Sequence, residues 1–257
     1  MSLEPTTNVP TTNVPTTRAS VTPAVSLQNI GKRYGDNVIL ADVGLALSPG
    51  KTVLLWGSNG AGKTTLLKLI ASRLRPSAGQ GQVFGLDLVQ DAAFVREQVC
   101  YAPVLGGFYG SLTGRENLEL ARYFYGATVD AVEAALAKVG LSHAQGQLVR
   151  RYSSGMKKRL ALAKVHLSGA ALWLLDEPYA SLDDNGKTLV DDLLQDAKRA
   201  KRTVIVASHD LARAYALCDG AIYIDQGRLY ARSPEVGYPE PNVHREPVKQ
   251  PVSHDAP

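Results

Sequence analysis

Residues 57–64 read Gly-Ser-Asn-Gly-Ala-Gly-Lys-Thr, and the rest of the chain can be placed relative to them. They fit the phosphate-loop pattern GxxxxGKS/T, in which glycines let successive backbone N–H groups turn inward and form a cradle for an anion. An apolar run at 52–56 precedes the loop, and apolar residues with helical spacing follow it over 63–75. This strand and this helix are the context that the loop requires, so the sequence predicts a site for a nucleotide phosphate at a helix N-terminus.

The last positions of the loop have side chains with their own chemistry. Lys63 can reach the β- and γ-phosphates of a nucleotide, and the hydroxyl of Thr64 can ligate Mg²⁺. The loop alone is compatible with a kinase, a GTPase or a motor ATPase. Its expected contacts with the nucleotide come from Gly57, Ser58, Asn59, Gly60, Ala61, Gly62, Lys63, Thr64 and Thr65.

Composition narrows the class of protein. The chain has 257 residues, of which 45% are apolar and 20% are charged, so it can bury a substantial core. Its formal net charge of +4 is compatible with a phosphate-bearing ligand or an anionic membrane surface and requires neither. Two cysteines, Cys100 and Cys218, are too few for a disulfide framework or a thiolate metal cluster. Apolar runs stay well below the ~18 residues of a membrane-spanning helix, and the N-terminus has no apolar segment typical of a secretory signal.

Proline placement divides the chain into three parts. Residues 6–10 read TTNVP, residues 11–15 repeat them, and prolines cluster again near the C-terminus. Such segments have too little apolar surface to offset the entropy that ordering them would cost. We therefore expect disordered tails at 1–24 and 233–257 on either side of one folded α/β domain at 25–232.

Strand-like and helical patterns alternate along the folded part. Residues 79–87, with three glycines, predict a hairpin. From a capping box that begins at Thr113, the pattern is helical only, as far as about residue 165. The sequence therefore predicts a mostly parallel core sheet with an all-helical insertion at about 113–165. Further strands are expected at 171–175, 203–207 and 221–225, and further helices at 130–139, 184–201 and 210–218.

A pair of carboxylates follows the strand expected at 171–175. Asp176 comes at the carboxyl end of this strand, where a parallel topology brings it beside the phosphate loop, so that it can hold a metal ion through water. Glu177 comes one residue later and can polarise an attacking water molecule. Acidic pairs at strand ends are often only solvated, but the buried apolar run before this pair favours a functional role.

Five motifs occur in a fixed order along the chain. They are the phosphate loop, Tyr152-Ser153-Ser154-Gly155-Met156, the strand that ends in Asp176-Glu177-Pro178, Ser181-Leu182-Asp183, and Ser208-His209-Asp210. Each motif is weak alone, but the whole set in this order resembles the nucleotide-binding domain of ATP-binding cassette (ABC) proteins over essentially all of 25–232. The resemblance implies a P-loop NTPase core with a mostly parallel sheet, an N-terminal antiparallel β subdomain and an α-helical insertion.

The resemblance also implies roles for matching positions. Tyr34 looks like the residue that stacks on adenine, and His209 looks like the switch histidine that hydrogen-bonds the γ-phosphate. The signature sequence, which in this family contacts ATP held by the opposite subunit, is matched at Ser153 and Gly155, whereas Tyr152, Ser154 and Met156 depart from its common form. The implied contacts with that ATP come from Ser153, Ser154 and Gly155. The loop that crosses the dimer interface is matched at Ser181, Leu182 and Asp183. With ATP and Mg²⁺ as cofactors, the implied catalytic residues are Glu177, His209 and Lys63, and the implied metal ligands are Thr64 and Asp176.

One position departs from the family pattern. Residues 101–104 read Tyr-Ala-Pro-Val, and the family usually carries a glutamine where this chain has Val104. Valine offers no oxygen to Mg²⁺, which demands oxygen ligands. We expect the chain to bind nucleotide despite this change. The coupling of hydrolysis to the 105–113 loop should be weaker. The alternative is that Val104 is only a packing residue.

Three functions are compatible with a domain of this kind. The ATPase subunit of a membrane transporter is favoured, and the membrane-spanning part must then be a separate chain. A soluble ABC ATPase acting on ribosomes or DNA is the alternative, but the chain has one phosphate loop, no heptad arm and no cysteine cluster. A small-molecule kinase would not need the motif at 152–156 or His209. The basic clusters 150–151, 157–159 and 198–202 are interpreted as solvated helix faces, so no nucleic-acid partner is expected.

The resemblance implies partners and cargo as well. Two copies are expected to sandwich two MgATP molecules head to tail, bound to separate transmembrane permease subunits at the cytoplasmic face of the cell membrane. The segments 84–87, 109–113 and 153–156 look most like the ATPase subunits of haem exporters in cytochrome c maturation. Exporters of a drug or a polysaccharide share much of this pattern, and the membrane chains recognise the cargo.

Overall fold

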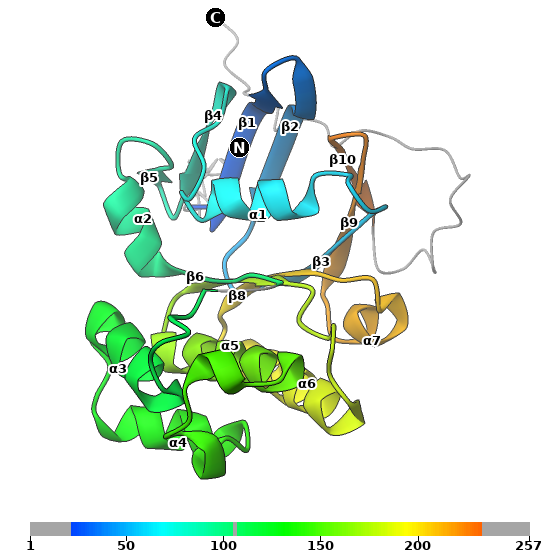
Figure 1. The fold of residues 1–257 in the computed structure, drawn as a ribbon. Helices are drawn as coiled ribbons and strands as arrows, with labels where there is room; N and C mark the ends of the chain where they lie inside the picture. The colour runs from blue at the N-terminus through cyan, green and yellow to red at the C-terminus, as the bar shows by residue number, and fades with distance from the viewer. Residues whose placement is uncertain (1–21, 105–106, 233–257) are drawn as a thin grey trace, which may run out of the picture.

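The computed structural model describes residues 22–104 and 107–232, and in this part of the chain two β-sheets are stacked with helices (Figure 1). The tails predicted from the sequence fall, over 1–21 and 233–257, outside the described residues. Helix α1 (Lys63–Ile70) lies between an antiparallel sheet and one side of a mostly parallel sheet. The helices α3 to α6 lie on the other side of the parallel sheet. The expected α/β class, with an antiparallel subdomain and a helical insertion, is confirmed.

The antiparallel sheet has the strand order β2-β1-β4-β5. Ala24, which the sequence analysis placed in the N-terminal tail, is buried here, and its N–H donates to the carbonyl oxygen of Leu47 at 2.7 Å. The hairpin predicted at 79–87 is present, with Phe84 and Gly85 as its two-residue turn at positive φ. The strands are β1 (Val25–Tyr34), β2 (Asn37–Leu47), β4 (Ala78–Val83) and β5 (Leu86–Asp87).

The second sheet is mostly parallel and has the order β10-β9-β3-β8-β7-β6. Only β10 is antiparallel to its neighbour, so the carboxyl ends of the other five strands meet at one edge. The strands expected at 52–56 and 203–207 have the bounds that the sequence predicted. The strands are β3 (Thr52–Trp56), β6 (Val99–Ala102), β7 (Leu172–Asp176), β8 (Thr203–Ala207), β9 (Gly220–Asp225) and β10 (Arg228–Arg232).

Strand β7 packs against a hydrophobic core on each face. Leu172 and Leu174 belong to the core that contains α1, whereas Trp173 and Leu175 belong to the core beneath the helical layer. Successive side chains of a strand point to opposite faces, so both faces need apolar residues. This explains why the strand reads as an unbroken apolar run, which is typical of a central parallel strand.

The helices follow most of the expected pattern. The capping box is present, since Thr113 Oγ1 accepts from the N–H of Glu116 at 3.1 Å and Glu116 accepts from the N–H of Thr113 at 2.7 Å. The helix expected at 63–75 ends earlier, because Ser72 has a φ of 49°, outside the helical region. No described helix is both long and apolar enough to cross a membrane. The remaining helices are α2 (Ala92–Gln98), α3 (Gly114–Tyr125), α4 (Asp130–Lys138), α5 (Ser154–Ser168), α6 (Asp184–Arg199) and α7 (Leu211–Ala216), with 3₁₀ turns at Ser142–Ala144 and Val149–Arg151.

The substitution Leu174→Ala tests the double burial of β7. Leu174 is fully buried, so the cavity left by its truncation should lower the free energy of unfolding by about 2–5 kcal/mol. Urea unfolding followed by circular dichroism measures this change. Val38→Ala, at an exposed position of β2, is the control and should change the free energy of unfolding by less than about 0.5 kcal/mol. Equal effects of the two substitutions would contradict the core position of Leu174.

Candidate nucleotide-binding and hydrolysis site

A cavity of about 480 Å³ lies at the edge where the parallel strands end. The loop after β3, the carboxyl end of β7 and the segment after β8 all contribute to its wall. Residues that the sequence placed in separate motifs therefore come together in space. The cavity is lined by Ile39, Asn59, Gly60, Ala61, Gly62, Lys63, Thr64, Thr65, Val104, Asp176, Glu177 and His209.

Two glycines show why the loop between β3 and α1 needs its residue types. A Cβ at Gly57 would lie 2.1 Å from the carbonyl oxygen of Ile224, so a larger residue does not fit. Gly62 caps α1 with a φ of 107°, a conformation that other residues rarely adopt, and a Cβ there would lie 2.7 Å from the side chain of Leu40. The loop can therefore lie close against β2 and β9 while it turns into α1.

The side chain of Lys63 curls back over this loop. The residue is only 7% exposed, and Nζ donates to the carbonyl oxygens of Gly57 at 2.7 Å and Ser58 at 3.1 Å. Burial lowers the pKa of Lys63, and the negative charges of Glu177 and Asp176 oppose that shift. A phosphate group in the cavity would meet an ammonium group already held at the loop, where charge-assisted hydrogen bonds are strong.

The hydroxyl of Thr64 and the carboxylate of Asp176 meet beside the loop. Thr64 Oγ1 donates to Asp176 Oδ2 at 2.9 Å, and the phenol of Tyr101 donates to the same oxygen at 3.1 Å. Burial and the charge of Asp176 raise the pKa of Tyr101, so Tyr101 stays a neutral donor. Hydroxyl and carboxylate oxygens fit Mg²⁺, which usually keeps water and phosphate ligands as well. In the described part of the chain no group of three or more Asp, Glu, His or Cys side chains could hold a metal ion.

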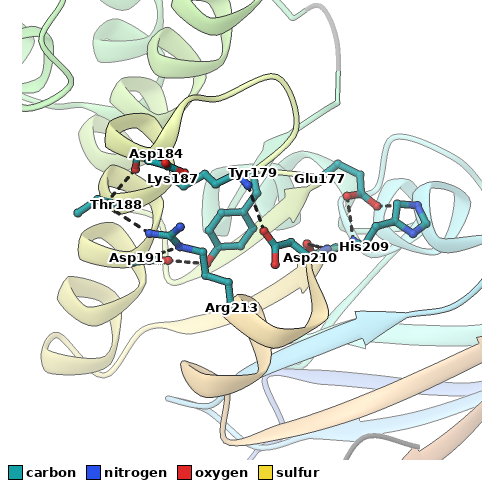
Figure 2. Close-up of polar contacts among 10 residues, drawn as sticks. Glu177, Tyr179, Asp184, Lys187, Thr188, Asp191, His209, Asp210 and Arg213 are labelled. Carbon is teal, nitrogen blue, oxygen red and sulfur yellow. Dashed lines mark hydrogen bonds and ion pairs between the residues drawn. The ribbon is translucent and has the colours of Figure 1, made fainter. Parts of the chain in front are cut away.

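Glu177 and His209 face each other beyond the ends of the neighbouring strands β7 and β8 (Figure 2). The backbone N–H of His209 donates to Glu177 Oε2 at 3.1 Å, and His209 Nε2 lies 3.1 Å from Glu177 Oε1. Burial raises the pKa of Glu177, while the charges of His209 and Lys63 lower it and that of Asp176 raises it. A carboxylate with a raised pKa is a stronger base toward water, which is the property that hydrolysis requires.

Tyr34, expected to stack on adenine, does not line the cavity. It ends β1 with 53% of its surface exposed, and Nζ of Lys32 lies 5.0 Å from the centroid of its ring. Ile39 of β2 lies at the cavity, and no sequence motif indicated this position. The sequence analysis also missed the hydrogen bond between Tyr101 of β6 and Asp176, because these two residues are 75 positions apart in the sequence.

The residues of the expected signature sequence lie outside this cavity. Ser153 is the N-cap of α5, and its Oγ accepts from the N–H of Met156 at 3.1 Å. Ser153 and Ser154 are exposed. Gly155 lies against the backbone of Ser181, since a Cβ at Gly155 would be 3.3 Å from that carbonyl oxygen. The start of α5 and the loop that contains Ser181 therefore lie side by side.

One of the basic residues that follow the expected signature sequence does not belong to a solvated face. That interpretation of 157–159 is wrong for Lys158, which is only 6% exposed and donates from Nζ to the carbonyl oxygen of Val104 at 3.1 Å. Arg159 forms an ion pair with Asp183 at 2.9 Å. Lys157 is exposed, and the Asp183 side chain that pairs with Arg159 is 65% exposed, so of the three basic residues only Lys158 is buried. Val104 thus offers its backbone oxygen to α5 at the position where the resemblance implied a glutamine side chain.

Comparison with known proteins relates the chain to ATP-binding transport proteins. The family model described as ABC transporter matches residues 40–180. The ABC transporter ATP-binding protein NatA of Bacillus subtilis is 32% identical over 219 residues, which cover 81% of this chain and 88% of NatA. The cytochrome c biogenesis ATP-binding export protein CcmA 2 of Cupriavidus metallidurans is 34% identical over 184 residues, 71% of this chain and 87% of that protein. A solved structure of an ATP-binding subunit of an ABC transporter has a TM-score of 0.75 at 28% identity and covers 81% of this chain and 88% of its own.

The substitution Lys63→Ala tests the phosphate loop. It removes charged hydrogen bonds, which contribute about 1.5–3 kcal/mol, so ATP affinity should fall by about tenfold to about a hundredfold. Equilibrium binding of a fluorescent ATP analogue measures this loss. Lys68→Ala, on the same helix but not at the cavity, is the matched control and should bind like the wild type. Wild-type affinity of Lys63→Ala would rule out a phosphate contact by Lys63.

Proposed function

Because this chain belongs to the ABC transporter family of ATP-binding proteins, we propose that it is the ATP-hydrolysing subunit of an exporter whose membrane-spanning subunits are separate chains. The main support for this proposal is that five residues from separate motifs line one cavity, namely Lys63, Thr64, Asp176, Glu177 and His209. Hydrolysis of a nucleoside triphosphate requires a cation, oxygen ligands for a metal ion and a base, and these are supplied here by Lys63, by Thr64 with Asp176, and by the partly buried carboxylate of Glu177.

Each of these groups has a separate part in the reaction. Lys63 neutralises charge on the β- and γ-phosphates from its place over the loop. Thr64 and Asp176 would hold Mg²⁺, which when bound neutralises charge on the phosphate oxygens. Glu177 orients a water molecule and takes its proton as that water attacks the γ-phosphorus, while the bond from this phosphorus to the bridging oxygen breaks and ADP leaves. His209 contacts the γ-phosphate and, through its backbone N–H, keeps the Glu177 carboxylate in place.

A second copy of the chain would complete the site. Ser153 and Ser154 present hydroxyl groups at the N-terminus of α5, where an anion is favoured, but they do not line the chain's own cavity. The loop at 181–183 lies beside them, with Gly155 against Ser181. This arrangement supports a head-to-tail dimer in which each α5 N-terminus contacts the γ-phosphate held by the partner.

The substitution Glu177→Gln tests the proposed base. The amide cannot take a proton from water, so turnover should fall by about 10²–10⁴-fold while ATP binding is retained. Phosphate release measures turnover, and Glu97→Gln, an exposed change on α2, should turn over ATP normally. Trapped ATP should also make Glu177→Gln sediment as a dimer with MgATP and as a monomer without it. Normal hydrolysis would exclude Glu177 as the base, and a monomer with MgATP would exclude the sandwich.

An exposed apolar face on α3 supports docking to a membrane-spanning subunit. Leu120, Tyr123 and Phe124 have the spacing of one helix face, and Tyr123 is 85% exposed. Phe94 of α2 is also exposed, and α2 lies on the same side of the molecule as α3 (Figure 1). Clustered exposed apolar side chains are typical of interaction sites. Docking of this face would hold the chain at the cytoplasmic surface of the membrane.

The cargo of this exporter is proposed from the sequence pattern and one relative. Haem export for cytochrome c maturation is supported by the segments described above and by the 34% identity to CcmA 2. The fluoroquinolones export ATP-binding protein MT2762 of Mycobacterium tuberculosis is 33% identical over 82% of this chain, which makes a drug the alternative cargo. A polysaccharide is a further alternative that rests on the sequence pattern alone. Identification of the co-purifying membrane subunit would separate these cases, because that subunit recognises the cargo.

The double substitution Tyr123→Ser with Phe124→Ser tests the docking face. It should prevent co-purification with the membrane-spanning subunit from solubilised membranes, because it replaces the apolar contacts with hydroxyl groups, and basal ATPase activity should be unchanged. Val38→Ser, exposed on the antiparallel sheet, is the control and should co-purify normally. Recovery of the membrane subunit with the double variant would rule out this face. Recovery of ribosomes or nucleic acid with the wild type would favour a soluble ATPase.

A further inference from the structure

One carboxylate on α6 receives hydrogen bonds from the segment that carries Glu177 and from α7, the helix that follows His209 (Figure 2). We define residues 177–183, between β7 and α6, as the first loop, and residues 208–210, between β8 and α7, as the second loop. Asp191 accepts from the phenol of Tyr179 at 2.9 Å on Oδ1 and from Nε of Arg213 at 2.7 Å on Oδ2. Both oxygens of a side chain that is only 18% exposed are therefore used.

The first loop has a strained backbone that needs an anchor. Glu177 has a φ of 49° and Ser181 a φ of 63°, and such conformations cost about 1–3 kcal/mol each unless the surroundings hold them. Tyr179, between them, is buried and reaches Asp191 with its hydroxyl group. Burial and this hydrogen bond raise the pKa of Tyr179, so it remains a donor. Tyr179 thus fixes the middle of the first loop to α6.

The second loop is anchored to the same helix. The six residues of α7, which follow this loop, are too few to form a stable helix without tertiary contacts. Arg213 of α7 donates to Asp191 and, from Nη2, to the hydroxyl of Thr188 at 3.4 Å. Lys187 of α6 lies 3.4 Å from Asp210, the N-cap of α7. The position of the second loop relative to β8 therefore depends on contacts with α6.

The two loops meet where Glu177 and His209 contact each other. Since Asp191 bonds to the first loop and to α7, which directly follows the second loop, we propose that it is a positioning residue for hydrolysis. Through Tyr179 and Arg213 it sets the separation between the Glu177 carboxylate and His209, although it does not line the nucleotide cavity itself. This inference rests on the hydrolytic roles proposed for Glu177 and His209.

The near-isosteric substitution Asp191→Asn tests the proposal. An amide can accept from Tyr179 or from Arg213, but its NH₂ group cannot accept from the other. We expect kcat to fall by about tenfold to about a hundredfold, because a displacement of about 1 Å in a catalytic group has effects of that size. The KM for ATP should stay unchanged, since the phosphate loop is not touched. Asp192→Asn, the exposed neighbour on α6, is the matched control and should keep the wild-type kcat.

A double-mutant cycle with His209→Ala separates positioning from a general loss of stability. Groups that act as a unit have non-additive effects on turnover. The loss caused by Asp191→Asn should therefore largely disappear in single-turnover measurements when His209 is already truncated. A residue that only stabilises the fold would cost the same factor in both backgrounds, and equal factors would overturn the proposal.

Two more variants decide the question if Asp191→Asn fails to bind ATP. Tyr179→Phe and Arg213→Gln each remove one bond to Asp191 and leave the carboxylate in place. Each of these variants should lower kcat and leave the KM for ATP unchanged. The proposal would be overturned by a wild-type kcat in both of them, or by a wild-type kcat in Asp191→Asn. Failure of the proposed function has a different signature, namely normal hydrolysis by Glu177→Gln or by His209→Ala.

Discussion

The hydrogen bond from Thr64 Oγ1 to Asp176 Oδ2 joins parts of the chain that are 112 residues apart, and the site depends on it. It can form only when β3 and β7 end at the same level on either side of β8. The register ensures this, because Ala207 of β8 pairs with Leu55 on one side and with Asp176 on the other. The same register places His209, two residues beyond Ala207, next to Glu177. The parallel sheet therefore assembles the site from its strand ends.

Charge balance extends the site from the cavity into the helical layer. Burial lowers the pKa values of Lys63 and Lys158, and in both cases Asp176 and Glu177 oppose the shift. A buried charge is costly unless other charges or hydrogen bonds compensate it. The two carboxylates stabilise the charges of the two lysines, and Lys158 also bonds to the Val104 carbonyl. The charges of Asp176 and Glu177 therefore also act on Lys158 of α5, the helix whose N-terminus would face a second subunit.

Features that depend on local chain geometry were predictable from the sequence. The strands at 52–56 and 203–207 have the expected bounds, because a strand buried on both faces is a continuous apolar run between turns. The phosphate loop and the capping box at Thr113 were recognisable, because each needs particular residue types at fixed spacing along a short backbone path. The helix expected at 63–75 was too long, since apolar spacing does not reveal the left-handed conformation of Ser72.

Side-chain partners from distant parts of the chain were decided only by the tertiary structure. Nothing near Lys158 in the sequence distinguishes it from a solvated lysine, and its burial follows from the loop that packs over α5. The contacts of Tyr101 with Asp176, and of Asp191 with Tyr179 and Arg213, join segments that are far apart in the sequence. The sequence by itself determined the elements and the chemistry of the motifs, because these follow from local hydrogen bonding and periodic burial. Which side chains meet was left to the packing of those elements, because periodicity indicates a face and not the neighbour that covers it.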